Sequence, residues 1–305
     1  MSTPSNEFMQ GLANPHIVQS PITHITIAFD VLHATGLVSV TVVLLTAWHS
    51  SQIRRTSTWF MFLCSWLLDG VTKLLLLGEQ AGPPPPFGIC VIQAALINAS
   101  PVLCGLYAVA LVAQTYASVA GAINSNPAKY KKYMTLTLLH ILPLAFFCGA
   151  FILALILGLE DRTSPQRSSL GVYCHLSKPL SKEVTGAFII FLAIIMSVLE
   201  VLIIIHVRRA WTDIRTLIAS RSSDQEHFSL DSLVRVVLIS LAPPLALVIS
   251  CFQFRAQHNE ETAALILVQS AFPLAMALLF GSQKDILQVW GVKRREKGSV
   301  RADFV

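Results

Sequence analysis

Long apolar segments separated by short polar loops make up most of this chain. Each segment has about 20 residues or more, the length an α-helix needs to cross the roughly 30 Å hydrocarbon core of a bilayer. A single segment in lipid can satisfy its backbone hydrogen bonds only as a helix. The pattern therefore predicts an all-α membrane protein, a bundle of seven transmembrane helices. The seven segments are residues 25–48, 59–77, 89 to about 120, 134–159, 184–207, 233–254 and 262–281.

A shorter pattern follows the last of these segments. Pro273 interrupts the apolar run and Gly281 closes it. Ser282 and Asp285 then have the S-x-x-D spacing of a helix capping box. The next apolar positions recur three and four residues apart: Ile286, Val289 and Trp290. This spacing predicts a short amphipathic helix over 282–291 that lies on the membrane surface.

These elements divide the chain into four parts. They are an N-terminal tail at 1–22, the seven-helix bundle at 23–281, the surface helix at 282–291 and a basic tail at 292–305. The first part has no basic start and no apolar core, so we expect no cleavable signal peptide, and the first span directs insertion. Only 13% of the residues are charged, against roughly 25% in soluble domains, which excludes a soluble globular protein.

The basic residues predict how the bundle is oriented. Of the 22 lysines and arginines, 16 fall in the C-terminal tail and one alternating set of loops, and Lys73 lies inside a span. The other five lie in the opposite loops: Arg162, Arg167, Lys178, Lys182 and Arg255. The positive-inside rule then places the N-terminus outside and the C-terminus in the cytoplasm, most simply at the plasma membrane. Basic residues that border apolar spans give no sign of nucleic-acid binding.

Two of the six cysteines differ from the rest. Cys90 lies at the outer end of the third span, four residues after the last of four consecutive prolines, and Cys174 lies in the longest outer loop, 160–183. Both face the oxidising side, so a disulfide between them is chemically permitted, the alternative being two separate thiols. The other four lie within spans, where cysteine usually serves as a small packing residue. They are Cys64, Cys104, Cys148 and Cys251.

Ionisable residues within the second span form the sharpest polar feature. Asp69 and Lys73 are four residues apart, so they share a helix face and can pair. Charges at this depth are costly and often functional. A structural ion pair, a ligand counter-ion or activation switch, and a lysine that reaches toward the interface all remain open.

Other polar residues within the spans are candidates for a ligand pocket or for bonds between helices. Asp30 and His33 lie one turn apart in the outer part of the first span, and the remainder are Gln93, Asn98, Tyr107 and Gln269. Either role is open for each, because polar side chains commonly join helices in membrane bundles.

Prolines within the spans suggest where the helices bend, and charged residues at the inner side suggest where two spans interact. Five prolines within spans are expected to kink their helices: Pro101, Pro143, Pro243, Pro244 and Pro273. At the inner side, Arg208 and Arg209 end the fifth span, and Asp231 and Arg235 begin the sixth. We consider an interhelical lock between these charges, or contact with solvent and lipid phosphate.

Seven spans, the placement of Cys90 and Cys174, and the ending Pro273…LLFGSQKDILQVWG resemble G-protein-coupled receptors. More narrowly, the chain resembles the receptor-like seven-span proteins of mushroom-forming fungi. The resemblance implies a Cys90–Cys174 disulfide, an extracellular ligand bound in the outer half of the bundle, and signalling to a heterotrimeric G protein. It also likens Asp69 to the mid-membrane acid of the second helix in rhodopsin-like receptors.

The chain departs from that family at two motifs. Where rhodopsin-like receptors carry Asp-Arg-Tyr, residues 114–117 read Gln-Thr-Tyr-Ala, and the Asn-Pro-x-x-Tyr motif is reduced to Phe-Pro-Leu-Ala-Met at 272–276. The usual ionic switch and tyrosine toggle therefore do not carry over.

Three other kinds of seven-span membrane protein have features that can be sought in the sequence. A retinal-binding opsin needs a lysine in the seventh span, and 262–281 contains none. A sugar transporter would show a proline-glutamine pair in each half, whereas the one such pair here, at 165–166, lies in an outer loop. A terpene-cyclase-type enzyme remains the alternative, with Asp30 and Asp69 as converging acids. We expect no metal and no cofactor.

Overall fold

The computed structural model describes residues 15–51, 53, 55–124, 136–168, 170–220 and 259–291. Several predictions concern residues outside these ranges: the sixth span at 233–254, Pro243, Pro244, Asp231, Arg235, Cys251 and the tail at 292–305.

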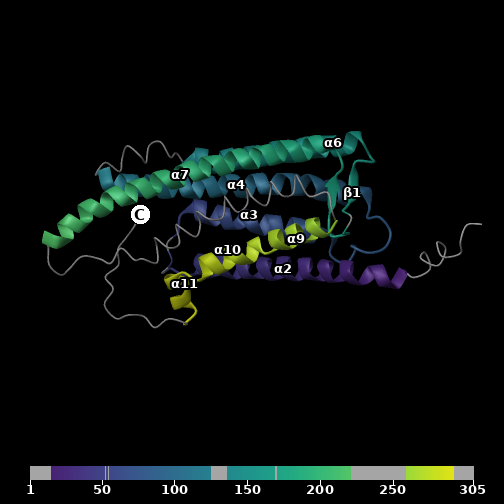
Figure 1. The fold of residues 1–305 in the computed structure, drawn as a ribbon, viewed down its shortest axis with the longest axis horizontal. Coiled ribbons are helices and arrows are strands. Elements are labelled where there is room, and N and C mark those ends of the chain that lie inside the picture. The colour runs from purple at the N-terminus through teal and green to yellow at the C-terminus, as the bar shows by residue number, and fades with distance from the viewer. Residues whose placement is uncertain are drawn as a thin grey trace, which may run out of the picture.

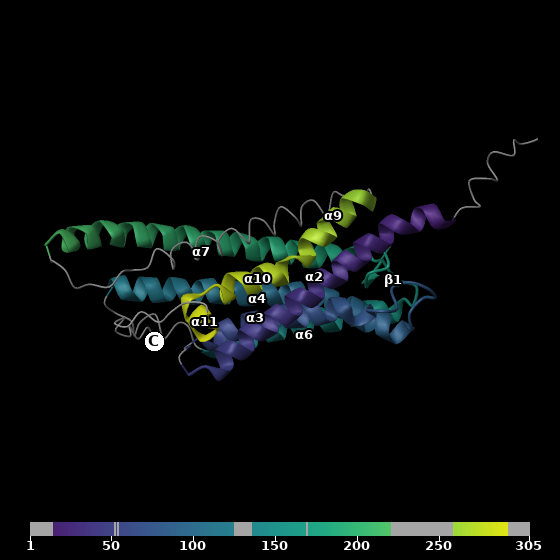
Figure 2. The ribbon, with the colours of Figure 1, turned by 90° about the horizontal axis from the view of Figure 1, so that it is seen from below.

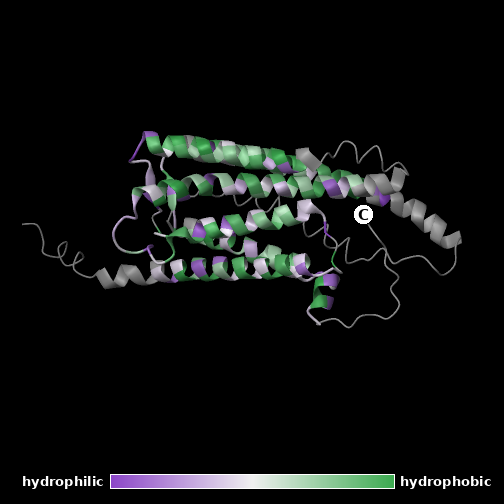
Figure 3. Cartoon of the chain, turned by 180° about the vertical axis from the view of Figure 1, so that it is seen from behind, coloured by the Kyte–Doolittle hydropathy of each residue, from purple (hydrophilic) through white to green (hydrophobic). Residues whose placement is uncertain are grey.

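Helices account for most of the described chain (Figure 1). They are α2 (Pro15–His49), α3 (Ser57–Lys73) with the short 3₁₀ helix η1 (Leu74–Leu76), α4 (Phe87–Asn124), α6 (Leu136–Glu160), α7 (Pro179–Ser220), α9 (Asn259–Ser270), α10 (Phe272–Gly281) and α11 (Lys284–Val289). Within the described ranges, six stretches are long and apolar enough to cross a membrane. They are Thr23–His49, Ser57–Leu76, Phe87–Ala117, Leu139–Glu160, Glu183–His206 and Ala263–Gly281. They coincide with the first five and the last of the predicted segments, as expected of a multi-pass membrane protein, and Figure 3 shows their apolar colouring.

The start of α2 differs from the sequence prediction, whereas the length of α4 agrees with it. Helix α2 begins at Pro15 and not at residue 23, so part of the predicted N-terminal tail is helical. Its first residues are too polar for the apolar pattern to reveal them. Helix α4, with 38 residues, is longer than a membrane span requires, as its apolar run predicts.

The helices run side by side, and α2, α3, α4, α6 and α7 alternate in direction (Figure 1). Helix α4 is central and packs against α3, α6 and α7, while α2 packs against α3 and α10. The largest apolar cluster lies between α2, α3, α4 and α10 and includes Val40, Trp59, Leu63, Tyr107 and Phe280. We call the end of the bundle that contains residues 90 and 174 the disulfide end, and the opposite end the α11 end.

Proline breaks the last span as predicted. Helix α9 stops at Ser270, and α10 starts at Phe272 with Pro273 in its first turn, where a missing N–H costs nothing. Figure 2 shows α9 inclined to α10. Helices α4 and α6, in contrast, continue through Pro101 and Pro143.

A close helix crossing lies beside this break. A Cβ atom built on Gly36 of α2 would lie 2.8 Å from the Cβ of Pro273 and 2.9 Å from the backbone nitrogen of Leu274. The absence of a side chain at Gly36 therefore lets α10 approach α2 at the point where the last span bends.

The loop between α6 and α7 contains a small β-hairpin, which corrects the all-α prediction. Strands β1 (Pro165–Arg167) and β2 (Cys174–Leu176) pair antiparallel, and Arg167 lies opposite Cys174. The turn between them includes Gly171, with a φ of 79°. Val172, Cys174 and Leu176 are buried alternately with more exposed neighbours. This period of two was present in the sequence but is short enough to be read as loop.

Helix α11 occupies the predicted surface-helix region at 282–291, with polar and apolar colours side by side in Figure 3. The predicted capping box is wrong, because Gln283 is the N-cap residue and the Ser282 hydroxyl donates back to the carbonyl of Leu279. Asp285 instead contacts Arg55, which precedes α3. A tertiary ion pair has thus replaced the local cap.

Candidate functional site

A cluster of polar side chains lies in the interior of the bundle, between α2, α3 and α4. The predicted ion pair is confirmed, with 3.6 Å between the Lys73 Nζ and an Asp69 carboxylate oxygen. Ser100 of α4 donates to the other carboxylate oxygen at 2.7 Å. Asp69 is 5% exposed and Lys73 9%, so water has little access to either charged group. The two opposite charges neutralise each other instead. Buried pairs of this kind are costly to break from one side only.

His33 of α2 completes the cluster. Its ring is fully buried and interacts electrostatically with both Lys73 and Asp69. Nδ1 lies 3.1 Å from the carbonyl oxygen of Phe29, and a carbonyl only accepts, so Nδ1 carries the hydrogen. When the ring is neutral, Nε2 is the accepting nitrogen. Within the described part of the chain Nε2 has no hydrogen-bond partner. A donor brought close to Nε2 would find an acceptor that is already desolvated.

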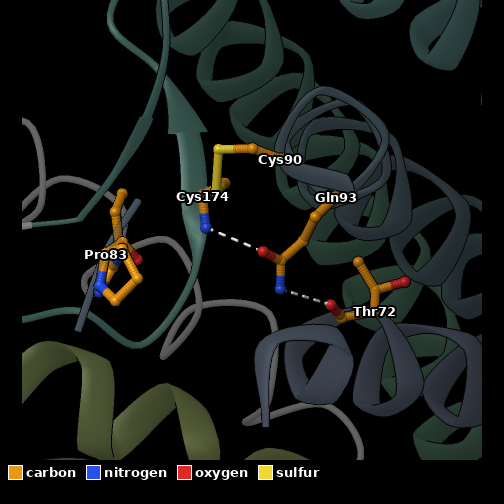
Figure 4. Close-up of a disulfide and its surroundings, with 6 residues drawn as sticks. Thr72, Pro83, Cys90, Gln93 and Cys174 are labelled. Carbon is orange, nitrogen blue, oxygen red and sulfur yellow. Dashed lines mark hydrogen bonds between the residues drawn. A yellow bond between two sulfur atoms is a disulfide. The ribbon is translucent and has the colours of Figure 1, made fainter. Parts of the chain in front are cut away.

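One side chain connects this cluster to the β-hairpin. Gln93 of α4 is fully buried; its amide oxygen accepts from the backbone N–H of Cys174 at 2.9 Å, and its amide nitrogen donates to the carbonyl of Thr72 at 3.0 Å (Figure 4). Thr72 is in the last turn of α3, where carbonyls lack the usual helical partner. Gln93 therefore provides a hydrogen-bond partner both to the last turn of α3 and to strand β2. The bonded carbonyl on α3 belongs to Thr72, the residue before Lys73.

The hairpin is fixed to the bundle by a disulfide and by several hydrogen bonds. Cys90 and Cys174 form a disulfide with 5.3 Å between their Cα atoms. Arg167 donates to the backbone carbonyls of Gln80 at 2.9 Å and Gly82 at 3.3 Å, and to that of Pro83. These bonds attach β1 to the proline-rich loop that precedes α4.

Asp30 belongs to this loop attachment and not to the interior cluster. Its carboxylate accepts from the Gln80 side chain at 2.7 Å. The neighbouring Thr26 hydroxyl donates to the carbonyl of Leu170, in the hairpin turn, at 3.4 Å. The sequence prediction that grouped Asp30 with His33 thus combined two residues with different partners.

Apolar contacts close the space between the hairpin and the helices. Leu170 and Val172 of the hairpin turn pack with Phe29 of α2 and with Ala263 and Ile266 of α9. The hairpin turn therefore covers part of the disulfide end with buried side chains.

The loop between α6 and α7 contains two groups with shifted pKa values. The Thr163 hydroxyl and backbone N–H donate to Asp161 and hold the pKa of that carboxyl below its usual value, aided by Lys178 at 3.9 Å. Burial raises the pKa of the Tyr173 hydroxyl. At neutral pH Asp161 is therefore ionised and Tyr173 is neutral.

The α11 end has a contact that the sequence prediction missed. Arg55 bonds Asp285 and Gln283, and its guanidinium lies 5.8 Å from the ring centroid of Trp59. Trp290 donates to the Thr46 hydroxyl at 3.0 Å. These bonds fasten α11 across the ends of α2 and α3. The basic residue after the first span and the acid after Gly281 were visible in the sequence, but nothing there paired them.

The remaining predicted site residues within the described ranges lie on α4, α7 and α9. Asn98 donates to the carbonyl of Ala94 in its own helix at 2.8 Å, and Gln269 is half-buried on α9. Tyr107 is buried, with its hydroxyl 3.5 Å from the carbonyl oxygen of His140. Arg208 is exposed, and the side chain of Arg209 lies outside the described part.

The two acids required by the enzyme hypothesis have separate partners. Asp30 is engaged by Gln80, and Asp69 by Ser100 and Lys73. A nearby ammonium group stabilises an ionised carboxylate, whereas a cyclase needs a carboxylic acid that gives up its proton.

No protein-family model and no curated protein matches the chain.

Proposed function

We propose that this chain is a multi-pass membrane receptor with seven spans, in which the apolar segment 233–254 provides the sixth. Its disulfide end faces outward and receives an extracellular ligand, and its α11 end faces the cytoplasm and a heterotrimeric G protein. The distribution of basic residues supports this orientation. The plasma membrane is the expected location.

The observation that carries the proposal is the double hydrogen bond of Gln93. It joins the hairpin, which a ligand at the outer end must touch, to the last turn of α3 beside the buried ion pair. A ligand that moves the hairpin changes the environment of Lys73 without entering the bundle itself. It then biases an equilibrium between two bundle arrangements by its difference in affinity for them.

Helix α3 carries the change to the opposite end. Its first turn contains Trp59, which packs edge-on against Phe280 of α10 and lies under the Arg55 guanidinium. A shift of α3 along its axis therefore acts on the attachment of α11. This route uses neither an Asp-Arg-Tyr motif at the end of the third span nor an Asn-Pro-x-x-Tyr motif in the seventh, both of which are missing at those places.

The test is ligand-dependent nucleotide exchange on a co-expressed heterotrimeric G protein, measured in membranes with the full chain. A panel of nutrients, lipids and peptides serves as the ligand source. A responding ligand should lose most of its effect in the variant Gln93→Leu. Ser197→Ala is the matched control, because among the described residues that hydroxyl bonds the Ala193 carbonyl of its own helix, at 2.9 Å.

Two results would count against the receptor. One is an absence of exchange across the panel together with turnover of a prenyl diphosphate substrate, which would favour the enzyme. The other is a full ligand response in Gln93→Leu, which would separate signalling from the hairpin connection.

A further inference from the structure

A groove of about 860 Å³ lies between α4, α6 and α7 on the outside of the bundle. Phe146 and Leu153 of α6 and Phe191 of α7 line it, and each is 45% exposed or more. The groove therefore opens sideways, away from the interior cluster. Its volume falls in the range of roughly 300–1,000 Å³ that is typical of small-molecule sites.

The groove is long and follows the helix axes. Its lining on α6 runs from Leu157 to Ala145, which spans about 18 Å at 1.5 Å per residue. On α7 it begins at Val184, next to the start of the candidate span at Glu183. The groove thus extends from the membrane interface toward the middle of the bilayer, where a ligand that enters sideways must come from the lipid.

Aromatic and small side chains line the groove. The rings of Phe146 on α6 and Phe188 on α7 stack, with centroids 5.4 Å apart and an interplanar angle of 27°. About one turn from Phe146 on the same helix, Gly149 has no side chain, and a Cβ atom built on it meets nothing within 4 Å. This shape suits a flat, rigid apolar body.

The lining contains two polar residues. Thr185 is on α7, two residues after the start of the span and so close to the interface. Asn98 is on α4, about 16 Å below the first residue of that helix at 1.5 Å per residue. One hydroxyl group at the interface and an apolar body below it would match this placement.

We propose that the groove binds one membrane sterol, with its hydroxyl at Thr185 and its fused rings against Phe146 and Phe188. A fused-ring body has few rotatable bonds, so it loses little conformational entropy in a narrow groove. An acyl chain of the same length must give up many rotamers on binding, and this cost lowers its affinity. The site is separate from the extracellular ligand site and adds a lipid requirement to the molecule.

The experiment uses the full-length protein in phosphatidylcholine nanodiscs that contain a photoreactive, alkyne-tagged sterol. Cross-linked peptides are mapped by mass spectrometry. Labels should concentrate on α6 and α7 residues of the groove and should be competed by untagged sterol. Gly149→Leu fills the open space and should lower the labelling about tenfold, the factor expected when roughly 1.4 kcal/mol of binding free energy is lost.

Gly88→Leu is the matched control, because a Cβ atom there also meets nothing within 4 Å but lies at the start of α4, outside the groove. Its labelling should equal that of the wild type. Thr185→Val keeps the side-chain shape and removes the hydroxyl, so labelling should fall about fivefold. This second variant carries the test if Gly149→Leu does not fold, as judged by thermal unfolding.

Three outcomes would overturn the proposal. They are wild-type labelling in both groove variants, labels spread evenly over all spans, and competition by an untagged fatty acid but not by untagged sterol. The second would indicate ordinary surrounding lipid, and the third an acyl chain as the occupant. None of these readouts involves a G protein, so failure here leaves the receptor proposal standing, and the reverse also holds.

Discussion

Replacing Gln93 with leucine removes both hydrogen bonds that connect the hairpin to helix α3, while the volume of the side chain changes little. The backbone N–H of Cys174 and the carbonyl of Thr72 lose their partner. Gln93 is 0% exposed, so water does not take its place. The disulfide from Cys90 remains, which confines the effect to the local docking of the strand.

The size of the effect follows from these two groups. A buried polar group left without a partner costs about 1–3 kcal/mol. Two such groups, less the favourable burial of the leucine, give about 2–4 kcal/mol of lost local stability. If the hairpin opens as a unit, this loss should speed hydrogen exchange of its backbone amides about 30- to 1,000-fold.

Hydrogen exchange followed by mass spectrometry measures this directly. Peptides that cover β1 and β2 should exchange faster in Gln93→Leu, while peptides from the middle of α7 should not change. Ser197→Ala should match the wild type throughout. Unchanged exchange in the hairpin would refute the energetic connection, and an equal increase in α7 would show general destabilisation instead.

Three further predictions concern other contacts. Lys73→Met leaves a buried carboxylate without its counter-charge and should lower the unfolding free energy in detergent by about 3–5 kcal/mol. Adding Asp69→Asn should recover part of this loss. A double variant that is no more stable than Lys73→Met would contradict the prediction. Gly36→Ala places a methyl group against the α10 backbone and should lower the unfolding free energy by about 1–3 kcal/mol. Gly149→Ala should be neutral or slightly stabilising. Equal unfolding midpoints of the two variants would refute the close crossing of α2 and α10. Arg55→Gln removes a half-exposed ion pair worth at most about 1 kcal/mol, so the bundle should stay stable while a spin label on α11 becomes more mobile; unchanged mobility would show that other contacts hold the helix.

Much of the membrane architecture was predictable because it depends on local composition. A segment such as 184–207 must be helical in lipid whatever its neighbours are, and the structure places α7 over it. Asp69 and Lys73 pair because a helix puts residues four apart on one face. The break at Pro273 likewise follows from the missing N–H of proline.

The contacts that join distant parts of the chain were not predictable in this way. Gln93 read as one of several polar residues within spans, and only the tertiary structure showed that it lies between Thr72 and Cys174. Asp285 satisfied a local capping pattern, yet it pairs with Arg55, 230 positions away. A sequence gives the spacing along one helix, but not which face of another helix lies opposite.

The sequence alone therefore predicted the candidate spans, their orientation and the chemistry available at each depth, since these depend on hydrophobicity, charge and the rise of a helix. Six of the seven predicted spans lie in the described residues. Tertiary structure decided which polar groups meet. It separated Asp30 from the interior cluster, placed the hairpin turn against Phe29 and left an open groove beside Gly149. Partners across helices depend on the rotation and register of whole elements, and many residues set these together.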